Sequence, residues 1–151
     1  MIHIEVQNVS ERAEVPTPAY FRCWAAAAVK RASAELVIRV VDRQEGAELN
    51  ERYRGKPGPT NVLSFPFQAP PGVACDELGD VVICAPLVQQ EALAQGKAER
   101  AHWAHLTVHG VLHLQGFDHL NPSEAEIMEA EEAAILARLG FPNPYEEVTS
   151  R

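Results

Sequence analysis

Residues 102–119 read HWAHLTVHGVLHLQGFDH, and five of the six histidines of the chain lie within this stretch. The first part of this stretch, residues 102–115, belongs to a helical pattern over 99–115 that stops at Gly116. His109 and His113 are four residues apart. An α-helix turns by about 100° per residue, so these two side chains point the same way, one turn apart. Two imidazoles in that arrangement can bind one tetrahedral metal ion.

A third histidine joins the pair only if the helix ends first. On an uninterrupted helix, His119 would face about 240° away from His113. Gly116 can take the left-handed conformation that ends a helix, so that residues 117–119 turn back toward the other rings. Three neutral histidines leave one position open for water and lower its pKa to about 7, as in catalytic zinc sites. We therefore expect a metal site at His109, His113 and His119.

The remaining histidines and the nearby acids receive weaker interpretations. His102 and His105 lie within about 60° of the helix face of His109, and we interpret them as packing residues or as residues that orient a ligand. Asp118 can also orient a ligand histidine. Asp80 either orients a group of the site or simply stands at the start of a strand.

The whole chain has 151 residues, of which 46% are hydrophobic and 23% are charged. This length predicts one domain over 1–151. Its apolar runs are far shorter than the roughly 20 residues of a membrane-spanning helix, and no secretory signal is visible. The three cysteines form no CxxC pair, which argues against a disulfide framework or a thiolate zinc site and favours a cytoplasmic location.

The net charge of −8 is unevenly distributed along the chain. Residues 1–56 contain 9 basic and 8 acidic residues, whereas residues 57–151 contain 4 basic and 13 acidic residues. Bulk attraction therefore does not draw this protein to polyanions, and any contact with nucleic acid must come from a local patch. The best candidate patch is Arg52, Arg54 and Lys56. We interpret the acidic run over 124–132 as a solvated helix face.

Hydrophobic periodicity predicts the element order β-α-β-α-β-β-α-α-α. The expected strands cover 2–6, 35–41, 62–67 and 78–85. The expected helices cover 18–33, 42–55, 86–95, 99–115 and 123–139. Pro66 favours an edge position for the third strand, and the third and fourth strands are expected to be antiparallel. Ser123 and Glu126 predict a capping box for the last helix.

The predicted fold class is α/β (α+β). It is a single small domain with a mixed sheet of about four strands enclosed by helices. The metal site is expected on a long helix and the turn that follows it. The tail over 142–151 is expected to be mobile.

Metzincin proteases use the same histidine spacing, in the pattern HExxHxxGxxH. In those enzymes the glutamate is the general base. Here Gly110 takes its place, which argues against a protease or a similar metallohydrolase without excluding it.

The fuller string over 109–119, HGVLHLQGFDH, resembles the HGxLHLxGxDH signature of the YbeY family, bacterial metal-dependent endoribonucleases. Two further segments agree with that family and occur in the same order. LNERYRG at 49–55 with PTNVLSFP at 59–66 is similar to the family's LNxxYRGK…PTxVLSFP. LGDVVI at 78–83 resembles its LGDIxI strand.

This resemblance implies an enzyme that cuts single-stranded RNA. Its implied roles are maturation of ribosomal RNA, notably at the 3′ end of the small-subunit rRNA, and ribosome quality control. It also implies one zinc ion per chain, with His109, His113 and His119 as ligands and Arg54 as a functional arginine. The implied partners are a ribosomal protein of the small subunit and an Era-type GTPase.

The chemistry is consistent with that reading. A metal ion and an arginine can together stabilise negative charge on a phosphodiester, which makes His113 and Arg54 the candidate catalytic residues. From the residues alone, Arg54 could equally complement the carbonyls at a helix end. Arg52 and Lys56 are weaker candidates for contacts to the RNA backbone. A non-catalytic ribosome-assembly factor, in which zinc only holds the fold, remains the alternative.

Overall fold

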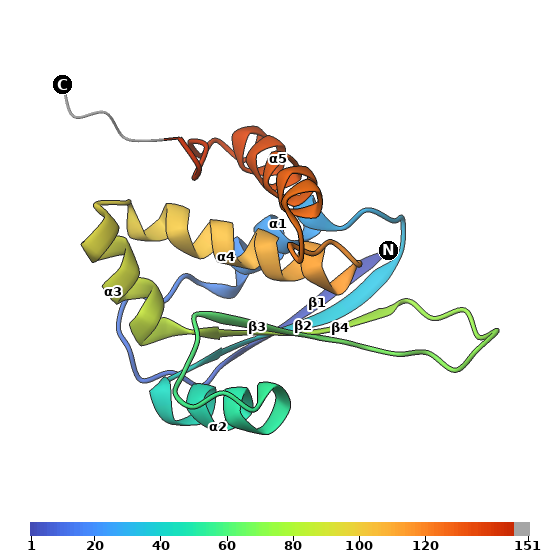
Figure 1. The fold of residues 1–151 in the computed structure, drawn as a ribbon, viewed down its shortest axis with the longest axis horizontal. Helices are drawn as coiled ribbons and strands as arrows, with labels where there is room; N and C mark the ends of the chain where they lie inside the picture. The colour runs from blue at the N-terminus through green and yellow to red at the C-terminus, as the bar shows by residue number, and fades with distance from the viewer. Residues whose placement is uncertain (147–151) are drawn as a thin grey trace.

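The computed structural model describes residues 1–146 of the chain, and this part contains the nine elements in the predicted order. The strands are β1 (Ile2–Asn8), β2 (Ala34–Val41), β3 (Val62–Pro66) and β4 (Glu77–Cys84). The helices are α1 (Pro18–Ala28), α2 (Arg43–Arg54), α3 (Ala85–Gln95), α4 (Glu99–Leu114) and α5 (Pro122–Arg138). The predicted class, a small domain with a mixed four-stranded sheet and helices, is confirmed (Figure 1).

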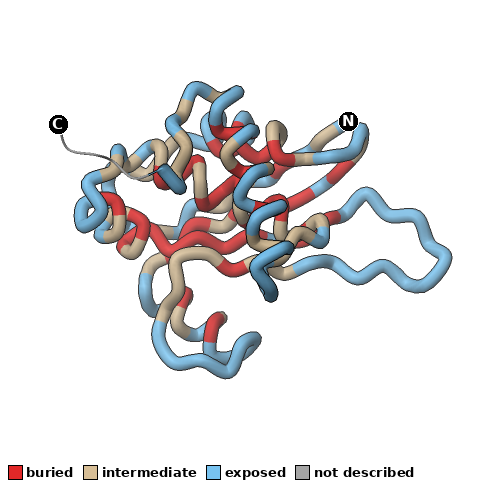
Figure 2. The backbone as a smooth tube through the Cα atoms, turned by 45° about the horizontal axis from the view of Figure 1, so that its top comes forward, coloured by how far each residue is buried: buried red, intermediate tan, exposed pale blue. Residues whose placement is uncertain are grey.

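The sheet has the strand order β1-β2-β4-β3. The pairs β1–β2 and β2–β4 are parallel, whereas β3 runs antiparallel to β4. The predicted edge position and antiparallel pairing of β3 are therefore confirmed. Figure 1 shows α1, α4 and α5 on one side of the sheet and α2 on the other. The loop over 67–76 that joins β3 to β4 is exposed throughout and extends away from the body of the molecule (Figure 2).

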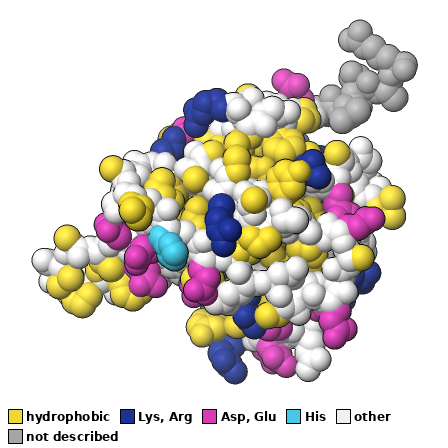
Figure 3. All heavy atoms as spheres, turned by 180° about the vertical axis from the view of Figure 1, so that it is seen from behind, with side chains coloured by type: hydrophobic (Ala, Val, Ile, Leu, Met, Phe, Trp, Pro, Cys, Tyr) yellow, Lys and Arg dark blue, Asp and Glu magenta, His cyan; other side chains and the backbone are white. Residues whose placement is uncertain are grey.

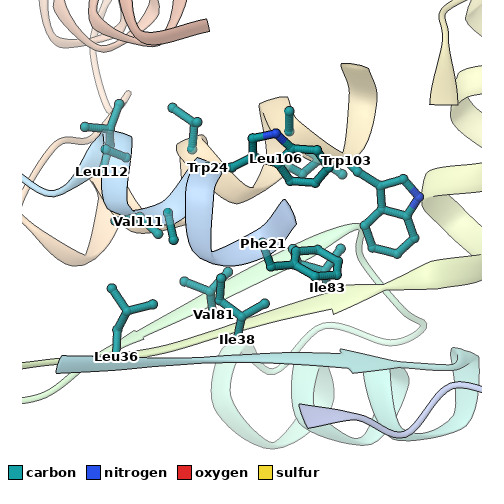
Figure 4. Close-up of a cluster of buried hydrophobic side chains, with 14 of the residues drawn as sticks. Phe21, Trp24, Leu36, Ile38, Val81, Ile83, Trp103, Leu106, Val111 and Leu112 are labelled. Atoms are coloured by element: carbon teal, nitrogen blue, oxygen red, sulfur yellow. The ribbon is translucent and has the colours of Figure 1, made fainter. Parts of the chain in front are cut away.

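The main core lies between the sheet and the helices α1 and α4 (Figure 4). Alternate residues of a strand point to one face, so Ile38 on β2 and Val81 on β4 both face these helices. They pack in one cluster with Phe21 of α1 and with Trp103 and Val111 of α4, and all five side chains are fully buried. This packing fixes α4 in the middle of the molecule. No helix in the described part of the chain is long and apolar enough to cross a membrane.

Two predicted helix ends are wrong. Helix α1 ends at Ala28 instead of Ser33, because Val29 is extended and the backbone N–H of Lys30 donates to the side chain of Gln115 at 2.7 Å. Helix α5 is capped by Asn121, whose side-chain oxygen accepts from the backbone N–H of Glu124 at 2.9 Å. The predicted Ser123 cap fails because Pro122, with its fixed φ and missing N–H, already suits the first helical position.

Gly46 offers a stability prediction in α2. A Cβ at this position would lie 3.5 Å from Cys84 Sγ and 3.6 Å from Pro59 Cβ, which is ordinary contact. A glycine inside a helix costs roughly 0.5–1 kcal/mol relative to alanine. Gly46→Ala is therefore expected to raise the free energy of unfolding by about that amount, measured by urea denaturation. Gly55→Ala, at a φ of 67°, is the matched control and should lower it.

Candidate active site

Three histidine rings come together beside the C-terminal half of α4. The rings of His109 and His113 are nearly parallel, with centroids 6.4 Å apart and an interplanar angle of 8°. The ring of His119 lies 5.7 Å from that of His109 and 6.3 Å from that of His113. The structure therefore gathers the three residues that the sequence predicted as one set.

A glycine turn returns the chain to these rings. Helix α4 ends at Leu114, and Gly116 has a φ of 98°, a conformation that other residues rarely adopt. The backbone N–H of Gly116 donates to the carbonyl of His113 at 3.1 Å, and that of Phe117 donates to Leu112 at 3.2 Å. This pair of bonds is the Schellman closure of a helix. It reverses the chain as predicted and places residues 117–119 beside the helix.

Hydrogen bonds fix the tautomer of two of the rings, those of His109 and His113. Nδ1 of His113 lies 2.8 Å from the carbonyl oxygen of Phe117, and Nδ1 of His109 lies 2.7 Å from Oε2 of Glu132. A carbonyl and a carboxylate only accept hydrogen bonds, so each Nδ1 carries its proton. The Nε2 atom of each ring is then left with a free lone pair, which is the form that binds a metal ion.

Glu132 is the residue that sequence reasoning missed. The acidic run over 124–132 predicts a solvated face, but Glu132 is fully buried, with 0% exposure. It occupies the inward stripe of α5, four residues after buried Met128 and three before buried Ile135, and this spacing was the available signal. Its Oε1 atom is 3.1 Å from Nε2 of His105.

The protonation of Glu132 follows from these contacts. Burial alone raises the pKa of its carboxyl group. The hydrogen bonds from His105, His109 and Tyr145 outweigh that effect and lower the pKa to about 2. The carboxylate is therefore charged and accepts hydrogen bonds from both histidines.

The segment after α5 reaches the same carboxylate. The Tyr145 hydroxyl donates to Oε1 of Glu132, and its ring lies 5.4 Å from that of His105. Tyr145 belongs to the tail over 142–151 that the sequence predicts to be mobile, and in the structure it contacts this buried charge. Residues 147–151 of that prediction lie outside the described residues.

The three histidines fit zinc in ligand type, and His109 and His113 also fit it in tautomer. Two imidazoles that share a tetrahedral zinc, at Zn–N distances of about 2.0–2.1 Å, have ring centres roughly 5 Å apart. The present centroids lie 5.7–6.4 Å apart, further than a closed site requires. In agreement, no group of three or more His, Cys, Asp or Glu side chains within residues 1–146 is arranged to hold a metal ion. The donor atoms are thus the right ones, in a more open arrangement.

Arg54 lines the same cleft as the histidines. The cleft has a volume of about 580 Å³ and is lined by the three histidines, by residues 62–66 of β3 and by Tyr53 and Arg54 of α2. Gly55, in the left-handed conformation, ends α2 directly after the arginine. An exposed guanidinium and three imidazoles therefore surround one space large enough for a nucleotide-sized group.

The other predicted residues lie elsewhere or act differently. Arg52 and Lys56 are exposed and do not line the cleft. Asp118 lines it, but its Oδ1 atom accepts from the backbone N–H of His119 at 2.8 Å, so it orders the turn and holds no ring. His105 contacts Glu132 and so shares a partner with His109.

Asp80 does not lie beside the three histidines. The next residue, Val81, faces α4, so strand alternation points Asp80 to the opposite face of the sheet. There it lines a separate hollow with Arg39 and Glu45. Burial, together with the nearby charge of Glu5, raises the pKa of the Asp80 carboxyl group.

Packing explains the glycine that replaces the glutamate of the proteases. Gly110 is buried where α4 crosses β4, and a Cβ at this position would lie 2.5 Å from Cγ1 of Val81. The hydroxyl of Ser64 on β3 donates to the Gly110 carbonyl at 2.9 Å. The helix and the sheet thus meet too closely here for a side chain as long as glutamate, so this position has no room for a general base.

Comparison with known proteins identifies the family. The family model described as Endoribonuclease YbeY matches residues 5–140. Endoribonuclease YbeY of Methylococcus capsulatus is 60% identical over 148 residues, covering 98% of each chain. Those of Alkalilimnicola ehrlichii and Nitrosococcus oceani are 55% and 53% identical, covering 95% and 97% of this chain and 91% and 99% of their own.

A solved structure shows the same fold. The solution structure of a protein from Thermotoga maritima matches over the full length of both chains, with a TM-score of 0.57 and 20% identity. The family resemblance of the three sequence segments thus extends over nearly the whole chain. The chain therefore belongs to the YbeY family of endoribonucleases.

Proposed function

We propose that this chain is a zinc-dependent endoribonuclease that cuts single-stranded RNA in the cytoplasm. Its role would be rRNA maturation at the 3′ end of the small-subunit rRNA and ribosome quality control. The observation that carries the activity is the cleft in which Arg54 shares one space with His109, His113 and His119. Relatives named Endoribonuclease YbeY, 53–60% identical over nearly the whole chain, support it. The rRNA role rests on the family signature, and the location rests on the cysteine content.

The chemistry required is stabilisation of negative charge on a phosphate. Arg54 offers a permanent positive charge and two parallel N–H donors that match the oxygens of a phosphodiester. His109, His113 and His119 would hold the zinc ion, which when bound supplies Lewis-acid stabilisation of a phosphate oxygen. Phe117 and Glu132 hold the Nδ1 protons of His113 and His109, so that the Nε2 atoms remain available as ligands.

The charge distribution bears on how RNA reaches this cleft. Figure 3 shows Lys and Arg side chains scattered among Asp and Glu side chains on the face opposite the view of Figure 1. With a net charge of −8, the protein has no long-range attraction for RNA. We propose that recognition is local, at Arg54, and that a small-subunit ribosomal protein and an Era-type GTPase bring the substrate to the site.

Arg54→Ala tests this proposal. Loss of a group that stabilises transition-state charge costs on the order of 10²–10³ in rate, so cleavage of a defined single-stranded RNA should fall by that factor. Arg43→Ala is the matched control, because Arg43 is an exposed arginine of α2 that does not line the cleft. Its initial rate should stay within about threefold of wild type, as expected for a surface position.

The same assay has an outcome that defeats the proposal. Equal rates for wild type, Arg54→Ala and Arg43→Ala, all zinc-loaded and purified identically, would remove Arg54 from the chemistry and with it the observation that carries the proposal. Mapping the RNA ends identifies the attacking group. Attack by a ribose 2′-hydroxyl leaves a cyclic phosphate, whereas attack by water does not.

A further inference from the structure

Glu132 places a charged carboxylate in the interior of the protein. An ionised carboxylate with 0% exposure is costly unless donors surround it. Here the donors come from α4 and from the segment after α5, so the carboxylate could serve only to hold these segments together. If it only held the segments together, hydrogen bonds from any donor would be enough. It would not matter which nitrogen of a histidine ring made the bond.

The contacts of Glu132 are more specific than that. Its Oε2 atom contacts His109 at 2.7 Å, while Oε1 contacts His105 at 3.1 Å and the Tyr145 hydroxyl. One oxygen is thus reserved for a histidine of the cleft, and that contact is made at Nδ1. A metal-binding imidazole almost always donates its other N–H group to such a partner, which fixes the tautomer and the ring orientation.

We propose that Glu132 is the positioning residue of His109, holding its Nδ1 proton and its ring orientation so that Nε2 is presented as a metal ligand. This inference rests on the proposed function, since it concerns the same site. His105 and Tyr145 fix the carboxylate in turn, because both donate to its other oxygen. His113 has a corresponding partner in the carbonyl of Phe117, so each of the two helical histidines has its own anchor.

Glu132→Gln tests the proposal with the shape of the side chain kept. The amide can turn its NH₂ group toward His109, which favours a proton on Nε2, the atom needed for the metal. Zinc affinity, measured by competition with a chromophoric chelator, should fall about 10- to 100-fold. Glu126→Gln is the matched control, because it removes an exposed carboxylate from the same helix. Its zinc affinity should equal that of wild type.

A second readout needs no metal. Long-range ¹H–¹⁵N NMR of metal-free wild type should show His109 with its proton on Nδ1, and Glu132→Gln should shift population to Nε2. A purely structural role would lower the melting temperature but leave both the tautomer and the zinc affinity unchanged. That result, or retention of the Nδ1 proton in a folded Glu132→Gln protein, would overturn the proposal.

The two measurements also separate this inference from the proposed function. If wild type binds no zinc, the zinc-dependent function fails, while the tautomer of His109 still decides the role of Glu132. If wild type binds zinc and Glu132→Gln binds it equally well, the positioning role fails and the function stands. If Glu132→Gln fails to fold, the tautomer of His109 is measured by NMR in Tyr145→Phe instead, and that result tests the positioning role. Loosening the carboxylate should then increase the Nε2–H population, and no change would count against the role.

Discussion

His113→Ala is expected to reduce cleavage of single-stranded RNA by zinc-loaded protein by on the order of a thousandfold or more. His113 is one of three ligands proposed for the ion, and a metal ion contributes several kcal/mol of transition-state stabilisation, at about 1.4 kcal/mol per factor of ten. The side chain is partly exposed in the cleft and makes one hydrogen bond, to the Phe117 carbonyl. Removing it should cost about 1 kcal/mol of stability, or roughly 2–4 °C in melting temperature.

The measurement compares initial cleavage rates and melting curves for wild type, His113→Ala and His3→Ala. His3→Ala removes an exposed histidine from β1, far from the cleft lining, and should behave as wild type. Unfolding of His113→Ala would favour the alternative of an assembly factor in which zinc holds the fold, since structural zinc contributes directly to folding. Undiminished cleavage by a folded His113→Ala would remove the metal site from the chemistry.

Gly110→Glu is expected to prevent stable folding. The first side-chain atom alone would meet Cγ1 of Val81 at 2.5 Å, and overpacking of this kind costs about 1–3 kcal/mol. The carboxylate would also enter the buried gap between α4 and β4, which costs several kcal/mol for an unpaired charge. Together these approach the roughly 5–15 kcal/mol that stabilises a typical domain. Soluble yield and thermal unfolding give the readout.

Gly110→Ala tests the same close contact with the smallest possible side chain. Alanine recovers up to about 1 kcal/mol of helix preference, but the contact with Val81 remains, so the free energy of unfolding should fall by about 1–2 kcal/mol at most. Gly46→Ala, where the nearest atom lies at 3.5 Å, is the matched glycine with room and should move the other way. If Gly110→Glu folds with the wild-type melting temperature, α4 and β4 are not in close contact, and the protease alternative returns.

Local rules carried most of the prediction of the fold. The order of the nine elements and the turn at Gly116 depend on periodicity and on backbone preferences that act over a few residues. The four-residue spacing of His109 and His113 likewise places both on one face without reference to the rest of the chain. One error occurred where two local signals compete, at the start of α5, where Asn121 and Pro122 prevail over Ser123. The other, at the end of α1, involves a contact between Lys30 and the distant Gln115.

The sequence by itself determined which three histidines gather in the cleft, the family, and the order of strands and helices, because each depends on residue patterns within short segments. Only the tertiary structure decided which acidic residues belong to the site. Glu132 stands in an acidic run and is buried against α4, whereas Asp80 follows a motif and faces the far side of the sheet. It also decided that Gly110 must lack a side chain, since that depends on how closely α4 approaches Val81. These outcomes depend on contacts between elements distant in the chain, and such contacts cannot be predicted from residue spacing.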